Sequence, residues 1–547
     1  MPLQKNQVLT LQVERLSSDG SGVAHSPEGE TVFIPGAAPG DEARVRIVKD
    51  CKRYAFGILD EVLTPSPDRI PVDCAVAGPC GGCSLRHLDY AAELRAKQEN
   101  VADAFARIGG LDVPVLPIVG SPEIDRYRNK VQFPVGTDKA GRPCIGFYAG
   151  RTHRIVPCPD CRLQPGVLNE IGNTLCAFFA EKGIHPYNEE TGKGLVRHIF
   201  LRRGAHSGQI MVCLVSTRAK LPSAEELCTR LKEAFPDIVT ILLNVNAKNT
   251  NVILGSETHT LYGQGYIEDT LCGVPVQLGP LSFYQVNTLA AEQLYGIAAE
   301  YAQLTPDDLL LDLYCGMGTI GLSMADHCRE LVGVEIVPEA IESAKANAAR
   351  MGAAVSAKSR FFCADAGQAA AQLAAEGLHP DVVMLDPPRK GCDEATLSAV
   401  VRMAPRRVVY VSCNPATAAR DAAWLEQNGY HAEKVQPVDL FPRTKHVETV
   451  CQLVLRKPAV HINIDVDVEE MVQDKRGTAT YGQIKDYVLE HSGMKVSSLY
   501  IAQVKQKCGI IERDNYNKPK SEDAKQPQCP PEKEKAIVDA LQYFGVI

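Results

Sequence analysis

Two apolar segments in the second half of the chain each end in polar residues that are able to do chemistry. The first runs into LDPPR (385–389), which contains Asp386, and the second runs into VSCNP (411–415), which contains Cys413. Prolines stop a strand and fix the loop that follows it, so both side chains are expected to be held rigidly at strand ends. A lone cysteine is usually a small buried residue, but this proline-bounded setting favours a nucleophile. Glu448, in HVETV just before the last predicted strand, is the candidate base.

A glycine-containing turn, DLYCGMGT (312–319), follows another apolar segment and opens a predicted helix. Its glycines allow the backbone to approach a ligand at a helix start. Some twenty residues later the strand GVEIV contains Glu335, whose carboxylate is placed to accept both hydroxyls of a ribose. The turn is not the G-x-G-x-x-G of a nicotinamide site, and D-x-x-x-G-x-G before an acidic strand end is typical of S-adenosylmethionine folds. Asp365, at the end of RFFCAD (360–365), is a candidate contact of the adenine amino group, and a simple surface residue is the alternative.

Five cysteines in the first third of the chain have the spacing of a metal site. The chain has 19 cysteines, an odd number scattered along it, which argues against disulfides. Close thiolates with small residues between them hold an iron-sulfur cube or a tetrahedral zinc ion. A radical enzyme needs C-x3-C-x2-C, and this chain has a different spacing. The five residues are Cys74, Cys80, Cys83, Cys158 and Cys161.

Hydrophobic periodicity predicts the elements that position these residues. Short alternating runs between residues 7 and 63, broken by Gly and Pro, predict a small β-barrel. A Pro-rich stretch at 64–74 is typical of a linker. A helix is expected at 87–108 and strands within 126–157 and 195–216, which makes this middle region α+β.

From about residue 285 continuous apolar strands alternate with Ala-rich helices. This pattern predicts a doubly wound sheet buried on both faces, with ligands at the carboxyl ends of its strands. The predicted fold class is therefore α/β, because a Rossmann-like domain follows a small OB-like barrel and an α+β domain. A charged tail follows, with helical patterns at 481–491 and 531–544 and a polar loop between them. With 547 residues the chain is too long for one core, and the expected domains are 1–63, 64–284, 285–458 and 459–547.

The net charge of −8 does not indicate a nucleic-acid ligand, so basic residues have to be considered locally. For any one basic cluster alone, a solvated strand face is the favoured interpretation. No apolar stretch is long enough for a membrane span and no signal peptide is recognised, so a cytoplasmic protein is expected. The clusters are Arg44, Arg46, Lys49, Lys52 and Arg53, then Arg126, Arg128 and Lys130 around Tyr127, then Arg197, Arg202 and Arg203.

The motifs DLYCGMGT, LDPPRKG, VSCNP and HVETV, with SFYQVN (282–287) ahead of them, resemble the signature series of the RNA uracil-5-methyltransferase family. They come in the family's order, and the resemblance covers residues 1–458. It implies that S-adenosylmethionine is the methyl donor and that Cys413 is the nucleophile and Glu448 the proton acceptor. The residues that it implies for donor binding are Gln285, Tyr314, Glu335 and Asp386.

The reaction of this family explains why these residue types are needed. Carbon 5 of uracil is a poor nucleophile, so a thiolate adds to carbon 6 and makes an enolate that attacks the methyl group. A base then removes the proton on carbon 5, and the thiolate leaves. The uracil must also leave its stack to expose carbon 6, so RNA that is flipped or single-stranded is expected.

The amino-terminal features resemble the branch of the family that acts on 23S ribosomal RNA. The barrel, with GSGVA (20–24) and FIPG (33–36), is similar to the TRAM domain, which holds RNA. The branch carries a [4Fe-4S] cluster on this cysteine spacing, which implies Cys74, Cys80, Cys83 and Cys161 as ligands and leaves Cys158 as an extra thiol. Zinc is the alternative metal.

Ribosomal RNA is therefore the expected partner, and no membrane or obligatory protein partner is expected. The transfer-RNA branch typically lacks both the barrel and the cluster, and methylation of transfer RNA is the alternative activity. A noncatalytic RNA-binding assembly factor is the alternative of another class. The tail resembles no family, but YIAQVKQK (500–507) with Arg513 and 515–518 mixes bases and aromatics as nucleic-acid surfaces do; a solvated helix and loop explains it equally well.

Overall fold

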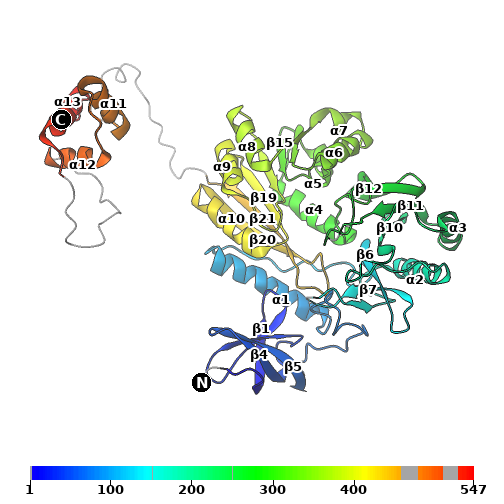
Figure 1. Ribbon diagram of the computed structural model, residues 1–547. Helices are drawn as coiled ribbons and strands as arrows, with labels where there is room; N and C mark the ends of the chain where they lie inside the picture. The colour runs from blue at the N-terminus through cyan, green and yellow to red at the C-terminus, as the bar shows by residue number, and fades with distance from the viewer. Residues whose placement is uncertain (1–2, 151, 249, 457–478, 509–527) are drawn as a thin grey trace. The chain divides into compact units, whose positions relative to one another are not determined.

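The computed structural model describes residues 3–150, 152–248, 250–456, 479–508 and 528–547. The chain forms two compact units, residues 1–457 and 458–547, which are described separately (Figure 1). None of the helices in these described ranges is long and apolar enough to cross a membrane.

The first unit begins with a closed barrel in the strand order β1-β2-β3-β5-β4. Alternate side chains point into the barrel, where Val13, Val32 and Val45 are buried, as the alternating sequence predicts. The strands are β1 (Val8–Leu16), β2 (Ser21–His25), β3 (Thr31–Pro35), β4 (Glu42–Asp50) and β5 (Tyr54–Thr64).

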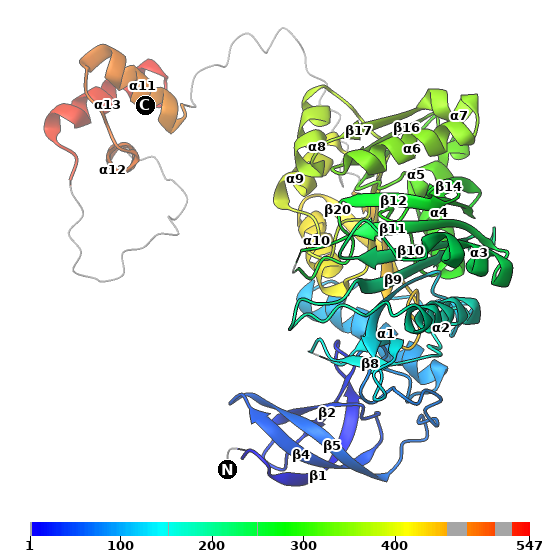
Figure 2. The same cartoon turned by 45° about the vertical axis from the view of Figure 1, so that its right-hand side comes forward.

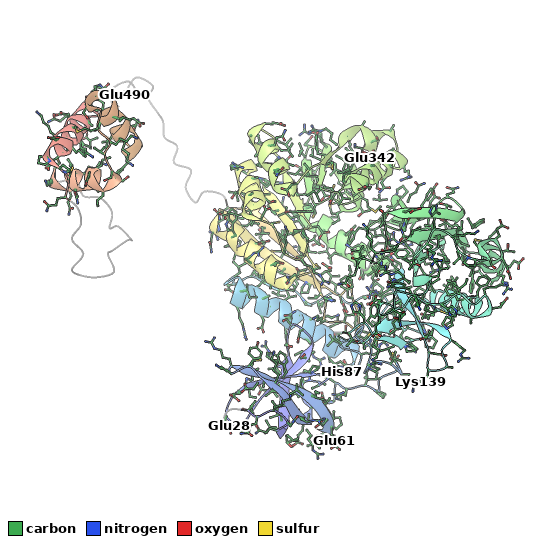
Figure 3. All side chains as sticks on the ribbon, viewed as in Figure 1. Glu28, Glu61, His87, Lys139, Glu342 and Glu490 are labelled. Carbon is green, nitrogen blue, oxygen red and sulfur yellow. The ribbon has the colours of Figure 1, made fainter. Side chains whose placement is uncertain are left out.

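The segment after the barrel is fixed to it. The buried carboxylate of Asp41 accepts hydrogen bonds from Arg69 at 2.7–3.0 Å and from the amide of Ser66 at 3.0 Å. His87 is buried beside Arg69, and burial lowers its pKa to about 4; Figure 3 labels it near the barrel. The predicted linker therefore docks the barrel and does not merely separate it from the rest.

The central region is built on a seven-stranded sheet in the order β12-β11-β10-β9-β6-β7-β8. Helices α2 (Gly166–Glu181) and α3 (Ala224–Ala234) pack on it, and a separate hairpin of β13 (Ile267–Leu271) and β14 (Val274–Leu278) follows. The strands of the seven-stranded sheet are β6 (Lys130–Thr137), β7 (Pro143–Tyr148), β8 (Ile155–Pro157), β9 (Val196–Arg203), β10 (Ile210–Ser216), β11 (Ile238–Val245) and β12 (Glu257–Tyr262).

The second large sheet has the order β17-β16-β15-β18-β19-β21-β20, which is the predicted doubly wound sheet with one antiparallel strand, β21, inserted near its edge. Figure 1 labels β15, β19, β20 and β21, and Figure 2 labels β16, β17 and β20. Its central strands are buried along their whole length because helices cover both faces. The strands are β15 (Leu309–Leu313), β16 (Glu330–Glu335), β17 (Ser359–Cys363), β18 (Val382–Leu385), β19 (Arg407–Ser412), β20 (Tyr430–Val438) and β21 (Glu448–Leu455).

One face of this sheet packs against α4 and α5 and the hairpin, and the other packs against α8, α9 and α10. The second face also receives α1 (Tyr90–Asp103) and the π-helix η1 (Ala104–Ile108), so residues that the sequence assigns to the central region pack on the Rossmann-like domain (Figure 1). The other helices are α4 (Thr288–Ala302), α5 (Thr319–Ser323), η2 (Ala325–His327), α6 (Pro338–Arg350), α7 (Ala353–Lys358), α8 (Ala366–Ala375), α9 (Glu394–Met403) and α10 (Pro415–Gln427).

In its described residues, 479–508 and 528–547, the second unit contains three helices around a small apolar core that includes Ile484, Ile501 and Ile537. They are α11 (Tyr481–Ser492), α12 (Ser498–Lys507) and α13 (Pro531–Tyr543). The first and last agree with the predicted helices, whereas α12 occupies part of the predicted polar loop. Arg513 and residues 515–518 lie outside the described residues.

The fold class expected from the sequence is confirmed, because the barrel, the α+β region and the doubly wound sheet are all present. Most of the predicted basic clusters have structural partners instead of free surfaces. Arg44 and Arg46 pair with Glu61 and Asp60, and Arg126 pairs with Asp160. Arg197 and Arg202 are buried and donate to backbone carbonyls of neighbouring loops.

Candidate active site

Strand register places the predicted nucleophile opposite the predicted base. Strands β19 and β21 are antiparallel, and Ser412 is the partner of Thr449. The hydroxyl of Thr449 also donates to the carbonyl of Ser412 at 3.1 Å. Cys413 follows Ser412 and Glu448 precedes Thr449, so the two residues face each other across adjacent strands.

The same edge of the sheet carries the predicted donor-binding residues. In the parallel strands, Leu313 is the partner of both Leu385 and Val334. Tyr314, Asp386 and Glu335 each follow one of these partners and therefore lie at neighbouring strand ends. All three open onto the crevice at the carboxyl edge, where doubly wound sheets bind ligands.

The thiol of Cys413 is half-buried among charged groups. Burial raises its pKa, and the carboxylates of Glu448 and Asp386 raise it further, while the guanidinium of Arg389 beside the thiol lowers it. The side chains of Asn414 and Thr417 donate to the carbonyl of Arg389 at 3.0 and 3.4 Å. These bonds tie the LDPPR loop to the loop that carries the cysteine, so the arginine is held near the thiol.

Three carboxyl groups in the crevice have raised pKa values. Burial, reinforced by repulsion from Asp386, raises the pKa of Glu448 to about 8 and that of Asp312 to about 8. Burial raises the pKa of Asp386 itself to about 7. One oxygen of Asp312 accepts from the amide of Gly321 at 3.0 Å, and the other has no hydrogen-bond partner in the described structure. Closely spaced carboxyl groups without enough cations favour a positively charged ligand.

The glycine-rich turn is held in the shape that a nucleoside ligand needs. Glu335 accepts from the amide of Gly316 at 3.1 Å and from those of Ile336 and Val337 at 2.9 and 3.0 Å. Gly316 has φ +55°, and a Cβ built on it meets nothing within 4 Å, so the space above it is open. Ile336 is 62% exposed beside this space and offers an apolar surface for a purine ring. S-adenosylmethionine, with a purine, a ribose and a sulfonium cation, fits these residues.

The remaining candidates have mixed surroundings. The carbonyl of Gln285 accepts from Asn129 at 2.7 Å, which joins this segment to the central sheet. Leu281 and Phe283, just before it, are 68% and 74% exposed and provide a surface on which a base can stack; the sequence gave no sign of their exposure. Asp365 accepts from the amide of Gln368 and caps α8, and its contact with adenine stays a prediction.

The five amino-terminal cysteines line one cavity of about 90 Å³ together with Arg86, Arg128 and Arg162. Within the described ranges no group of three or more His, Cys, Asp or Glu side chains is arranged to hold a single metal ion. Cys158 donates to Cys161, and this hydrogen bond lowers the pKa of Cys161 to about 7, whereas burial raises the pKa of Cys83 to about 11. The thiols therefore surround a space and do not converge on one point.

A doubly wound sheet with this turn, an acidic second strand end and an anionic crevice defines an S-adenosylmethionine-dependent methyltransferase. Comparison with known proteins specifies the family. The chain matches the model of the tRNA (uracil-5-)-methyltransferase family over residues 209–457 and that of the TRAM domain over residues 2–59.

An uncharacterised RNA methyltransferase of Halalkalibacterium halodurans is 43% identical over 456 residues, which cover 83% of this chain and 98% of the relative. A second, from Clostridium tetani, is 42% identical over 450 residues, covering 82% and 97%. The solved structure of the Pyrococcus abyssi tRNA (uracil-54, C5)-methyltransferase with S-adenosyl-L-homocysteine is similar with a TM-score of 0.65 and 27% identity, covering 82% of this chain and 100% of that one. The chain belongs to the RNA uracil-5-methyltransferase family and is an S-adenosylmethionine-dependent RNA methyltransferase.

Proposed function

We propose that this enzyme methylates carbon 5 of a uridine in 23S ribosomal RNA through a covalent bond between Cys413 and carbon 6. The observation that carries the proposal is the antiparallel register that sets Cys413 opposite Glu448 at the edge where the methyl donor fits. A nucleophile and a base that face each other can act on neighbouring carbons of one flat ring.

Cys413 gives its proton to solvent and its thiolate adds to carbon 6, which moves negative charge through the ring onto carbon 5 and the carbonyl oxygen. The sulfonium donor would supply the methyl group to carbon 5, and its sulfur would keep the electron pair of the broken bond and leave as a neutral thioether. Glu448 then accepts the proton that carbon 5 still carries, the C5–C6 double bond re-forms, and the bond between C6 and sulfur breaks. A pKa of about 8 suits Glu448 to this step, because a group that titrates near neutral pH both accepts and returns a proton readily.

The barrel supports RNA as the macromolecular substrate. Phe33, Tyr54 and Phe56 form an aromatic cluster with ring centroids 5.7–5.8 Å apart, and Tyr54 is 41% exposed. Lys52 and Arg53 directly precede Tyr54 in the chain. Exposed aromatic rings next to cations are suited to stacking on unpaired bases and to holding phosphates.

Ribosomal RNA is the proposed substrate because the barrel and the cysteines together resemble the ribosomal branch. Transfer RNA is a second candidate for a specific reason. The Pyrococcus abyssi neighbour, whose name gives uracil 54 of transfer RNA as its target, aligns over its entire length with most of this chain. Mapping 5-methyluridine in both RNA classes, with and without this protein, separates the two: loss of a 23S site supports the proposal, and loss of a transfer-RNA site alone refutes it.

We further propose a [4Fe-4S] cluster held by Cys74, Cys80, Cys83 and Cys161. A four-iron cube binds each thiolate through a different iron, so its ligands stand further apart than those of one zinc ion. Thiols that surround a cavity without converging fit the cube better than they fit zinc. The neighbouring Arg86 and Arg162 would offset the negative charge of a thiolate-bound cluster.

The covalent step has a direct test in two variants. Glu448→Gln should add the thiolate and transfer the methyl group but leave the adduct in place, and so give a denaturation-resistant protein–RNA band. The band should disappear in the Glu448→Gln, Cys413→Ala double variant. RNA that contains 5-fluorouridine should give the same band with the wild-type enzyme, because carbon 5 then has no proton to lose. A Cys413→Ala enzyme with near-normal turnover would refute covalent catalysis.

A further inference from the structure

Nine residues, 439–447, connect β20 to β21 directly before Glu448, and we call them the base loop. Val438 and Glu448 are paired at its two ends. In the described structure no hydrogen bond holds the Glu448 carboxylate itself. Its position therefore depends on the backbone of β21 and of the base loop.

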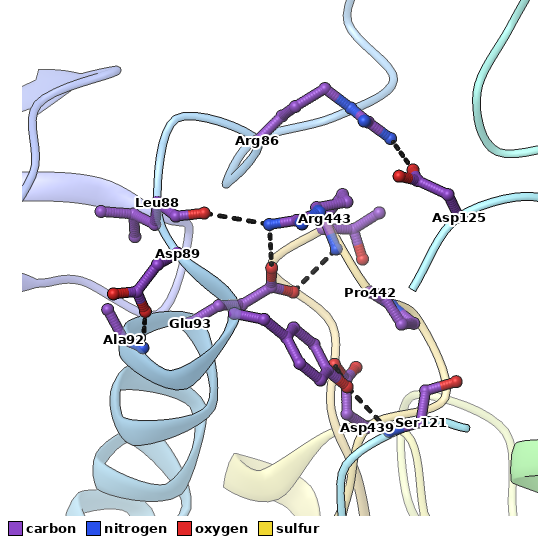
Figure 4. A network of polar contacts seen from close by, with 12 residues as sticks. Arg86, Leu88, Asp89, Ala92, Glu93, Ser121, Asp125, Asp439, Pro442 and Arg443 are labelled. Atoms are coloured by element: carbon purple, nitrogen blue, oxygen red, sulfur yellow. Dashed lines mark hydrogen bonds and ion pairs between the residues drawn. The ribbon is translucent and has the colours of Figure 1, made fainter. Parts of the chain in front are cut away.

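The base loop is anchored by a buried charged network on α1 (Figure 4). The ammonium group of Lys97, which is 2% exposed, donates to Glu93 at 2.7 Å and to Asp439 at 2.7 Å. It also donates to the carbonyl of Phe441 at 3.1 Å. Asp439 accepts in addition from the hydroxyl of Tyr90 at 2.9 Å. One lysine of α1 thus binds the side chain that begins the base loop and the backbone two residues further on.

Glu93 extends this anchor to the middle of the base loop. Its carboxylate accepts from the amide of Arg443 at 2.7 Å, and the Arg443 guanidinium donates to the carbonyl of Leu88 at 2.9 Å. Arg443 has φ +67°, a left-handed conformation that a residue with a side chain rarely adopts. Outside contacts are needed to hold such a conformation, and Glu93 supplies one of them.

Other segments that carry predicted site residues also form hydrogen bonds with the base loop. The amides of Ser84 and Leu85, directly after Cys83, donate to the carbonyl of Arg443 at 3.1 Å. Asn287, two residues after Gln285, donates to the carbonyl of Leu440 at 3.1 Å, and Tyr127 donates to that of Pro442 at 2.9 Å. The base loop is therefore held by main-chain and side-chain contacts from at least three separate segments.

A buried charged network is a poor source of stability, because desolvation of the charges offsets most of their attraction. It does impose a definite geometry, since each charge must keep its partners. Here the geometry that it imposes is that of the residues leading into Glu448. A structural role for α1 alone would not require Lys97 to bind the base loop at two points.

We propose that Lys97, with Glu93 and Asp439, is a positioning residue for proton removal: it holds the base loop so that Glu448 reaches the proton on carbon 5. This inference rests on the proposed role of Glu448. It assigns the network to one step, after methyl transfer, and not to thiolate addition, because Cys413 is held by a different loop.

The test follows the two steps separately in single turnover with Lys97→Met. Methyl transfer should stay within about threefold of wild type, whereas release of the adduct should slow by about tenfold to 100-fold, since a displacement near 1 Å has effects of that size. RNA with deuterium on carbon 5 of the uridine should then show an isotope effect that is larger than in the wild type. Arg95→Met is the matched control, because it removes an exposed ion pair with Asp68 from the same helix.

Tyr90→Phe decides the question if Lys97→Met does not fold, because it keeps the buried charges and removes one hydrogen bond to Asp439 and one from the Ser121 amide, and it should cause a smaller delay of the same kind. Equal slowing of methyl transfer and adduct release, or no slowing in either variant, would overturn the inference. Wild-type enzyme that gives no band with 5-fluorouridine RNA would instead refute the proposed function on which the inference rests.

Discussion

The chain places cysteines in two settings with different charged neighbours. In the crevice the single thiol of Cys413 lies near two carboxylates and one guanidinium, and its pKa is raised. In the amino-terminal cavity five thiols lie with three arginines, and the pKa of Cys161 is lowered to about 7, first by the Cys158 thiol that donates to it and then, against burial, by backbone amides and Arg86. Burial nevertheless raises the pKa of Cys80, and that of Cys83 to about 11, so this cavity does not favour the thiolate at every cysteine.

The difference follows from what each sulfur has to do. A nucleophile needs its thiolate form only once the substrate is bound, and carboxylates nearby favour the protonated thiol until then. A metal ligand must be a thiolate at all times, and cations nearby favour the charged form. Thus the charged neighbours differ between the two settings, whereas burial does not separate them, since most thiols of both sets are half-buried.

The largest expected effect is a reciprocal loss of function in the two settings. Cys413→Ala should reduce methyl transfer by at least about 10³-fold, as expected when a covalent nucleophile is removed, and leave the iron content unchanged. Cys80→Ala should reduce iron from about four atoms per chain to a small fraction of that, because loss of a thiolate ligand destabilises the cube. Iron and sulfide analysis of anaerobically purified protein, with a methylation assay, measures both. Stoichiometric zinc in colourless wild-type protein would contradict the cluster.

The next largest effect concerns the pKa values of Cys413 and Glu448, which the carboxylates and the guanidinium of the crevice shift. Methylation by the wild type should rise with pH up to about 8, because Cys413 and Glu448 must both lose a proton and the pKa of Glu448 is raised to about 8. Arg389→Leu removes the group that lowers the Cys413 pKa, so alkylation of this thiol at pH 7 should slow by about threefold to tenfold. Alkylation is followed by mass spectrometry, with Arg142→Leu, an exposed arginine on a distant turn, as control. Faster alkylation in Arg389→Leu would mean that Arg389 does not lower the pKa of Cys413.

The sequence alone predicted part of the crevice. Proline-bounded motifs at strand ends located Asp386 and Cys413, because parallel strands bring their carboxyl ends to one edge. The sequence did not predict β20 (Tyr430–Val438), because it lacks the continuous apolar run by which the other strands of this sheet were recognised. Without β20 the base loop has no defined start. The sequence therefore placed Glu448 near the crevice but not directly opposite the cysteine.

Long-range contacts were the part that the sequence could not supply. Lys97 looks like an ordinary helix lysine in YAAELRAKQENVAD, and its partner Asp439 is 342 residues away. The buried arginines gave a similar difficulty: Arg197 and Arg202 resembled a basic surface, yet both bind backbone carbonyls inside the fold. Local patterns report which charges are present, whereas burial and distant partners decide what they do.

A smaller effect concerns the extra thiol of the cavity. Cys158→Ala removes the hydrogen bond to Cys161 but none of the four proposed ligands, so the protein should still bind roughly three to four irons and lose them faster in air. Cys161→Ala should bind far less. The two variants are compared by iron content before and after timed exposure to oxygen. Equal loss of iron from both variants would indicate that Cys158 is itself a cluster ligand. It would then not serve only as a hydrogen-bond donor to Cys161.

The smallest effect is expected from the second unit, which has a core of its own and lies outside the matched family regions. Truncation after Pro458 should leave the first unit folded and methyl transfer to a short RNA unchanged, because all of the crevice residues precede the cut. Binding to long RNA should weaken in a salt-dependent way if the mixed basic and aromatic residues of the tail contact phosphates. Lys505 and Lys533 each lie over a tyrosine ring, at 4.7 and 5.9 Å, so part of this charge is engaged within the unit and the loss should be modest, about twofold to fivefold. Affinity is measured by titration at two salt concentrations, and identical binding curves for the full and the truncated chain would show that the tail does not contribute to RNA binding.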